Sequence, residues 1–268
     1  MARSIWNGTI TFGLIAVPIK VYSATESHTI HFHQVHESDG ARIKQKRMCA
    51  KEGKEVPYKE VAMGYEVRGG EFVMLEKEEI DAAAGDRAHT IELEQFVERE
   101  QVDPVYYNRT YYLGAGSDGE DAYRLLHDAL ERAGRTGLGR WVFHNREYLV
   151  AVRAGDDVLV LHTMRFADEL VGVEKLDIQA PSRKPSDREL DMAEQLVESL
   201  QKKFRPASFK DSYRDRVADL IKRKASGEEI EMPDYEEPEA PDDLMAALEA
   251  SLGNGGKKKS RSGSKARS

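Results

Sequence analysis

The chain has 268 residues, of which 40% are hydrophobic and 33% are charged, and its formal net charge at pH 7 is −8. This length allows one large domain or one domain with appendages, and the sequence contains neither an apolar run long enough to span a membrane nor a signal peptide. The single cysteine, Cys49, excludes an internal disulfide and fits a reducing cytoplasm, so we expect a soluble intracellular protein.

Residues 4–22 have the pattern of two strands joined by a bend. Polar and apolar side chains alternate in the first half, with Trp6, Ile10 and Phe12 on the apolar side, which is typical of a half-buried strand. Gly13 interrupts the pattern. Pro18 lies inside the second run and marks a strand edge, a strand start or a bulge, because proline cannot donate to a ladder. We predict a bent strand pair whose apolar residues join the core.

A histidine cluster comes next, at His28, His31, His33 and His36. Because residues 30–35 alternate as a strand does, His31 and His33 would share one face, and imidazoles two residues apart can bind zinc. No cysteine or acidic residue accompanies them at a ligand spacing, so a structural role is the alternative. Cys49 alone cannot close a zinc knuckle, although a nucleophilic cysteine paired with a histidine stays open. We predict no metal and no cofactor.

The strongest chemical signal in the body of the chain is a basic cluster, formed by Arg42, Lys44, Lys46, Arg47 and Lys51. Its first three cations alternate, so on a strand or ribbon they would line one face at intervals of roughly 7 Å. That arrangement would present guanidinium and ammonium groups to a phosphate backbone. The alternative is a solvated hairpin face, and composition alone does not decide between the two.

Short strands dominate the rest of the first two thirds of the chain. Strand-like segments lie at 65–75, 90–97, 102–113, 139–144, 147–153 and 158–164, and turn residues separate the last three. Many short strands at close spacing favour a β-barrel or a sandwich. Helices are predicted at 120–133, where Gly134 provides a stop, and at 76–84. The sequence contains no phosphate-cradling motif and no nucleophile elbow, which argues against an ATP-driven machine.

A helical arm is predicted to begin after the composition changes near Pro181. Ser186 and Glu189 form a capping box ahead of an apolar stripe at helical spacing, and a second helix is expected over about 210–224. Residues 225–256 contain ten acids and no Lys or Arg, which is typical of a linker. Within it, 241–252 form a short amphipathic helix that would be marginal alone, so docking to a partner is favoured over a place in the core.

The C-terminal residues 257–268 contain no acid and six cations: Lys257, Lys258, Lys259, Arg261, Lys265 and Arg267. Such a tail suits DNA, RNA or anionic lipid equally well. If all six cations displaced counterions from duplex DNA, they would add about −5 to the slope of log K against log salt. The two charged blocks leave a net charge of only −4 on residues 1–224.

Many short motifs follow one another in order from about residue 2 to residue 252. They are Trp6-Asn-Gly, Phe12-Gly-Leu, Val17-Pro-Ile-Lys-Val-Tyr22, Phe32-His-Gln-Val-His36, Arg42 to Arg47, Gly53-Lys-Glu-Val-Pro-Tyr58, Gly64-Tyr-Glu66, Asp103-Pro-Val-Tyr-Tyr107, Tyr111-Tyr-Leu113, Met164-Arg-Phe-Ala-Asp-Glu169 and Asp243-Leu-Met-Ala-Ala-Leu248. In these motifs the chain resembles the bacterial Ku family, homodimeric DNA-end-binding proteins of prokaryotic end joining. The chain departs from the resemblance at Glu52, where many relatives have the second cysteine of a Cys-x-x-Cys hairpin.

The resemblance implies a mainly β fold with α elements, in which a Ku-core β-barrel spans 1–180 and carries a DNA-encircling hairpin at about 40–62. A helical arm at 181–225, an acidic linker with a short ligase-docking helix at 226–252, and a flexible, disordered basic tail at 253–268 would follow. The N-terminal α/β domain of eukaryotic Ku would be absent. The six tail cations would assist DNA contact, and the ligase-docking residues would be Leu244, Met245, Leu248 and Leu252.

The implied function is non-enzymatic. Two copies would form a ring around duplex DNA, bind ends without regard to sequence, protect them and recruit the multifunctional end-joining ligase (ligase D type) in double-strand break repair by non-homologous end joining. The protein would be cytoplasmic and nucleoid-associated. One alternative is a metal-dependent nuclease or hydrolase built on the cluster from His28 to His36. Another is a general chromatin-type protein that coats DNA.

Overall fold

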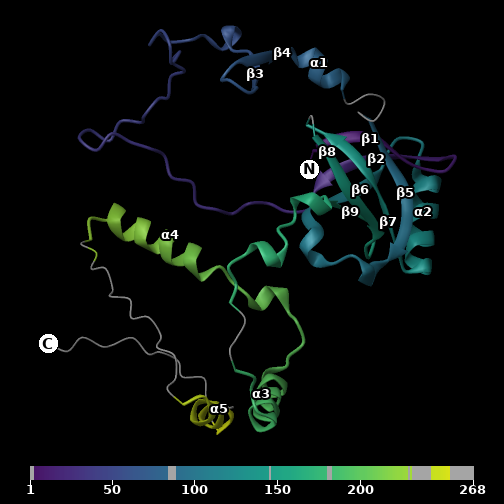
Figure 1. Ribbon diagram of the computed structural model, residues 1–268, viewed down its shortest axis with the longest axis vertical. Helices are drawn as coiled ribbons and strands as arrows, with labels where there is room; N and C mark the ends of the chain where they lie inside the picture. The colour runs from purple at the N-terminus through teal and green to yellow at the C-terminus, as the bar shows by residue number, and fades with distance from the viewer. Residues whose placement is uncertain are drawn as a thin grey trace. The chain divides into compact units, whose positions relative to one another are not determined.

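The computed structural model describes residues 3–83, 89–144, 146–179, 183–228, 230 and 243–253. The chain divides into two compact units, Met1–Leu176 and Asp177–Ser268. Seven strands of the first unit form a closed barrel in the order β1-β2-β6-β9-β8-β7-β5, in which β1 and β5 pair in parallel and the other neighbours are antiparallel (Figure 1). The predicted mainly β fold is confirmed, and the barrel is the form it takes.

The elements follow the predicted order with one exception. The strands are β1 Trp6–Phe12, β2 Ile15–Ser23, β3 Met63–Glu66, β4 Phe72–Leu75, β5 Thr90–Glu98, β6 Tyr107–Ala115, β7 Arg135–Phe143, β8 Arg146–Ala154 and β9 Leu159–Met164. The helices are α1 Lys77–Ala82, α2 Glu120–Ala133, α3 Asp187–Leu200, α4 Ser212–Ala225 and α5 Leu244–Gly253. The strand expected at 30–35 is wrong, because that segment has only an isolated bridge between Val35 and Arg42.

The first two strands form the predicted bent pair. Gly13 turns the chain between them at a φ of 57°, a left-handed conformation that favours glycine. Pro18 pairs with Thr9 in the middle of β2, and its carbonyl accepts a hydrogen bond from the Gly116 N–H at 2.8 Å. The pairing of β2 with β6 starts at the next residue, Ile19, so Pro18 lies at the end of that ladder, where a missing N–H is tolerated.

The core lies inside the barrel and follows the two-residue period of the strands. Trp141 is fully buried and stacks on Phe143, with ring centroids 4.5 Å apart, while Trp6 meets it edge-on at 5.5 Å. The fully buried aliphatic residues include Ile10, Val17, Val21, Ile91, Leu113, Val150, Val152, Leu159 and Leu161. The expected core role is confirmed for Ile10, whereas Trp6 and Phe12 are half-buried and pack against the core.

Helix α2 packs against β2, β7 and β8 and adds two buried leucines, Leu126 and Leu130, to the core. The hydroxyl of Tyr123 donates to the Leu113 carbonyl at 2.6 Å and accepts from the Leu159 N–H at 2.8 Å. Burial raises the pKa of Tyr123, so this hydroxyl stays protonated at neutral pH. The tyrosine therefore ties the helix to β6 and β9 together.

The second unit is helical. Ser186 and Glu189 form the predicted capping box at the start of α3, and Asp211 caps α4 by accepting from the Arg214 N–H at 2.9 Å. Helix α5 packs against α3 (Figure 1). None of the helices within the described ranges is both long and apolar enough to cross a membrane.

Candidate nucleic-acid interface

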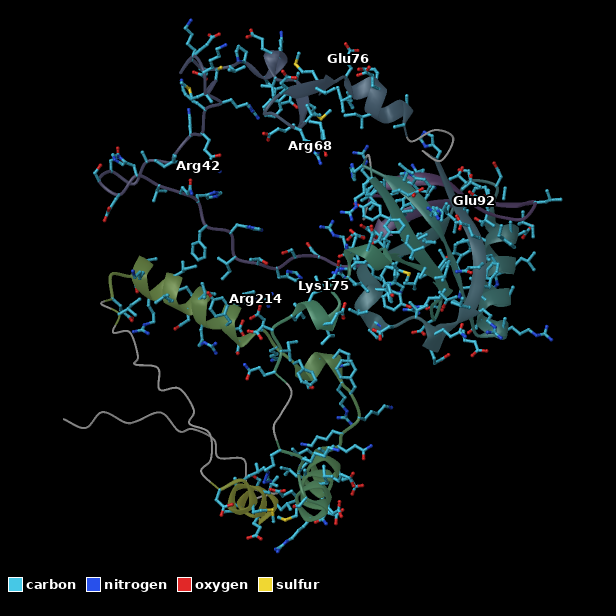
Figure 2. All side chains as sticks on the ribbon, in the orientation of Figure 1. Arg42, Arg68, Glu76, Glu92, Lys175 and Arg214 are labelled. Carbon is cyan, nitrogen blue, oxygen red and sulfur yellow. The ribbon has the colours of Figure 1, made fainter. Side chains whose placement is uncertain are left out.

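The predicted basic cluster lies on the long connection between β2 and β3. Two isolated bridges, Val35 with Arg42 and Met48 with Glu55, fold this connection into two small loops. Figure 2 shows Arg42 on the extended backbone that joins the two strands. Every residue from 25 to 79 is exposed or half-buried. The connection therefore presents its side chains to solvent or to a partner.

All five cations of the cluster, which we call the basic segment (residues 42–51), are exposed. They do not lie on a regular strand, so the strand on which their alternation would line one face is not formed. Three have neighbours: Arg42 Nη2 donates to His33 Nδ1 at 3.2 Å, Lys46 Nζ pairs with Glu55 Oε2 at 2.6 Å, and the Arg47 guanidinium lies 5.1 Å from the Tyr58 ring centroid. These are exposed, weak contacts that a phosphate can replace.

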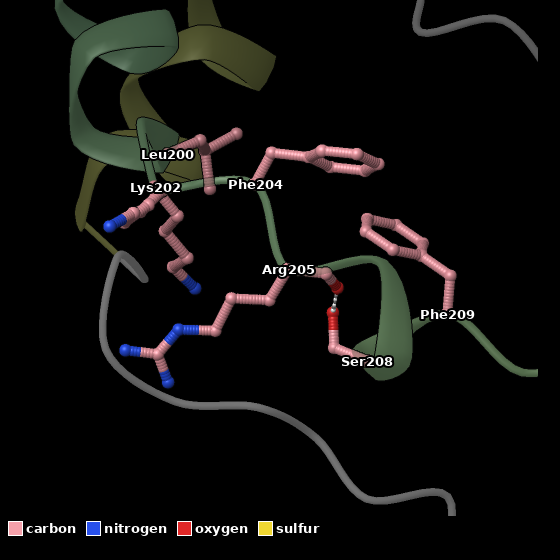
Figure 3. A pocket seen from close by; sticks show the side chains of 7 residues that line it. Leu200, Lys202, Phe204, Arg205, Ser208 and Phe209 are labelled. Atoms are coloured by element: carbon pink, nitrogen blue, oxygen red, sulfur yellow. Dashed lines mark hydrogen bonds between the residues drawn. The ribbon is translucent and has the colours of Figure 1, made fainter. Parts of the chain in front are cut away.

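A second basic surface, in the helical arm, was not predicted from the sequence. Residues 199–224 contain nine Lys or Arg and three Asp. At its start a pocket of about 700 Å³ is lined by Leu200, Lys202, Lys203, Phe204, Arg205, Ser208 and Phe209. Figure 3 shows Phe204 and Phe209 near each other, while Lys202 and Arg205 extend away from them. The two ring centroids lie 5.9 Å apart, and the ring planes are tilted by 39°. A charge count over a sliding window would have found this stretch.

In the described part of the chain, the four histidines of the cluster do not bring three ligand atoms together. All four histidines are exposed, and His36 Nδ1 lies 3.2 Å from Asp39 Oδ1. Within the described ranges, three ligand atoms close enough to hold an ion occur instead at His127, Asp128 and Glu131. The nuclease alternative therefore has no assembled site at its proposed histidines.

His127 is held by hydrogen bonds that a proton explains. Its Nε2 lies 3.1 Å from the Gly155 carbonyl and its Nδ1 lies 3.1 Å from Asp128 Oδ1, and both partners are acceptors. Burial alone would lower the pKa of His127, but the hydrogen bonds to Asp128 and Gly155 and the charge of Glu131 outweigh it and raise this pKa. A protonated imidazole satisfies both acceptors, so the contacts require no metal ion.

A second histidine, on β9, is kept neutral. His162 Nε2 accepts a hydrogen bond from Arg153 Nε at 3.1 Å, and Nδ1 lies 3.0 Å from Thr110 Oγ1. Burial first, and the charge of Arg153 second, lower the pKa of His162 to about 4. The neutral ring can accept from the arginine and donate to the threonine at once, which links β6, β8 and β9.

The remaining predicted site residues lie toward the C-terminus. The six cations from Lys257 to Arg267 fall outside the described residues. Of the four predicted docking residues, Leu244 is 51% exposed, whereas Met245, Leu248 and Leu252 are half-buried. The latter three share one face of α5, and that is the face at which the helix loses exposure.

Comparison of the sequence with known proteins identifies relatives of this chain. The family model described as Ku70/Ku80 beta-barrel domain matches residues 11–192. The chain is 43% identical over 254 residues to the non-homologous end joining protein Ku of Anaeromyxobacter sp. (strain K), covering 94% of this chain and 86% of the relative. It is 38% identical over 252 residues to that of Solibacter usitatus (strain Ellin6076), covering 94% of each. It is 40% identical over 253 residues to Ku 1 of Saccharopolyspora erythraea, covering 93% and 77%.

Proposed function

The chain belongs to the Ku family of non-homologous end joining proteins, and from that premise we propose that it binds the ends of double-stranded DNA during break repair. The role requires no catalytic residue, because it consists of holding and protecting an end. The observation that carries the proposal is the basic segment, whose five cations are all exposed on a connection without buried residues. Such groups bind phosphates regardless of base sequence.

The proposed DNA contacts come from three parts of the chain. The first is the basic segment, with Arg42, Lys44, Lys46, Arg47 and Lys51. The second is the set of cations between 202 and 224 in the arm, which lie beside exposed aromatic rings that can stack on bases. The third is the C-terminal tail with its six cations. The affinity for DNA through these three parts would fall strongly as the salt concentration rises.

We propose that two copies form the DNA-binding unit. Several large apolar side chains on the connection and on the β3–β4 hairpin are mostly exposed in the single chain: Phe32 73%, Tyr58 76%, Tyr65 70%, Phe72 63% and Met74 72%. Exposed apolar surface of this kind marks an interface, and a twofold dimer covers the same patch on both copies. A ring built this way would load only from a free end, so end selectivity would be topological.

The end-joining ligase is the proposed protein partner of α5. Asp243 caps this helix by accepting from the N–H groups of Met245 and Ala246 at 2.9 and 3.2 Å. Its apolar residues Leu244, Met245, Leu248 and Leu252 would provide the docking surface, in the manner of a short helix laid into a groove.

Competition between DNA topologies tests the proposal. The full chain is titrated with one plasmid in linear, nicked-circular and covalently closed forms at several salt concentrations, and the nicked circle controls for supercoiling. A ring that threads ends predicts preference for the linear form over both circles, lost when both ends are capped by bulky groups. Equal binding to all three forms would support the DNA-coating alternative, and degradation of the linear form would support the hydrolase. Sedimentation at a mass near twice 30.2 kDa would support the dimer, and a monomer would contradict it.

A further inference from the structure

Helix α3 offers α5 one face and leaves another open. Its half-buried residues are spaced three and four apart and form one stripe: Glu189, Met192, Ala193 and Leu196. Other apolar residues of α3 lie on the solvent side, with Leu190, Val197 and Leu200 exposed by 46%, 70% and 64%. Glu189 is covered by Ser186 and Arg183. Because α5 packs against α3, we assign Met192, Ala193 and Leu196 as the surface that it occupies.

The matching face of α5 consists of Met245, Leu248 and Leu252, which are half-buried and spaced three and four residues apart. Arg188 Nη2 lies 3.5 Å from Glu249 Oε1, which joins the two helices at one edge of the contact. A helix of ten residues is marginal in water without tertiary packing. The contact with α3 supplies that packing.

We propose that α3 is the receptor surface for α5 within the same chain, so that a partner can reach the Met245, Leu248 and Leu252 face only after α5 leaves α3. This rests on the proposed function, because the partner is the end-joining ligase. Three of the four proposed docking residues already face α3, and one helix face cannot pack against two surfaces at once. The ligase therefore competes with the arm for the same side chains.

The tether sets the strength of this competition. The segment that joins α3 to α5 has 43 residues, 201–243, and includes α4, and two sites linked within one chain meet at an effective concentration of up to about millimolar. If α5 is docked nine times in ten, the apparent affinity of the ligase falls about tenfold. Opening the contact should restore that factor.

Hydrogen exchange on the full chain tests the contact. Leu196→Glu places a carboxylate in the covered stripe of α3, whereas the control Val197→Glu places it one residue further, at a 70% exposed position. We expect α5 amides to exchange about tenfold faster in the first variant and at the wild-type rate in the control, with α3 amides monitored for folding. Equal α5 exchange in all three proteins would overturn the contact. If L196E unfolds α3, the contact is opened instead by Glu249→Arg, which places two like charges at positions 188 and 249. Adding Arg188→Glu to that variant restores the ion pair with reversed charges and should restore the wild-type exchange of α5.

Binding of the full-length variants to the end-joining ligase from the same organism tests the competition. L196E should bind about tenfold more tightly than wild type, and V197E should bind as wild type does. Unchanged affinity in L196E, with α5 exchange accelerated, would overturn the competition while the docking role survives. If Leu248→Asp leaves ligase binding intact, the proposed docking by α5 fails, and the exchange result still decides whether α3 holds α5.

Discussion

Removing the cations of the basic segment should reduce the salt dependence of DNA binding. The size of the reduction shows how many copies of the chain bind one DNA end. The quadruple variant R42Q/K44Q/K46Q/R47Q removes four exposed charges, which lowers the slope of log K against log salt by about 3.6 per chain if all four contact phosphates. Lys46 is paired with Glu55 at 2.6 Å, and if that pair persists on DNA the loss is about 2.7. Two copies double these values, to about 5.4–7.2 per bound unit.

Fluorescence anisotropy of a short blunt-ended duplex, titrated with the full chain across a sodium chloride series, measures these slopes. R124Q/R132Q is the control, because both arginines are exposed on α2 of the same unit and should leave the slope unchanged. Glu55→Gln releases Lys46 and should raise the slope by as much as about 0.9 per chain. An unchanged slope in the quadruple variant would refute a phosphate-binding role for the basic segment and leave the arm and the C-terminal tail as the proposed contacts.

Two further predictions concern the barrel. Tyr123→Phe leaves the Leu113 carbonyl and the Leu159 N–H without their shared partner, so the free energy of unfolding in denaturant should fall by about 2–4 kcal/mol; a loss no larger than that of Tyr112→Phe, at a 48% exposed side chain, would contradict this. His162 has a pKa of about 4 in the folded chain against about 6.5 when unfolded, so its contribution to stability is present above pH 6.5 and is lost as the pH falls toward 4. That loss should amount to about 1–3 kcal/mol after solvent screening, and thermal melts of His162→Gln should lack it; equal pH dependence in both proteins would argue against the assignment.

Elements whose signals are local could be predicted from the sequence. Alternation around Ile10 predicts β1, the capping box at Ser186 predicts the start of α3, and Gly134 ends α2 at a φ of 61°, where glycine is favoured. In each case the residues that determine the element lie within it or next to it. The family resemblance likewise rested on short contiguous motifs.

Features that depend on distant neighbours could not be predicted. Residues 30–35 alternate as a strand does, yet among the described residues no strand pairs with them beyond the Val35 bridge, and an unpaired extended segment is not stable as a sheet. The position of α3 determines which side of α5 is half-buried. That side includes Met245, whereas Leu244 is exposed. The cations of the arm were not predicted for another reason. The net charge of residues 1–224 is only −4, because the acidic residues of the barrel unit outweigh these cations in the sum.

End binding through the basic segment and ligase recruitment should be separable, because different units carry the residues of each. The basic segment belongs to the first unit, while α3 and α5 belong to the second, and the ion pair between Arg188 and Glu249 involves no cation proposed to contact DNA. We therefore expect the quadruple variant of the basic segment to leave α5 exchange unchanged, and L196E to leave the affinity for linear DNA unchanged. If L196E also alters DNA affinity, the acidic linker beside α5, with ten carboxylates in 225–256, must compete with DNA for the cations. Recruitment would then be coupled to end binding through charge, and the effect would diminish as salt screens that charge.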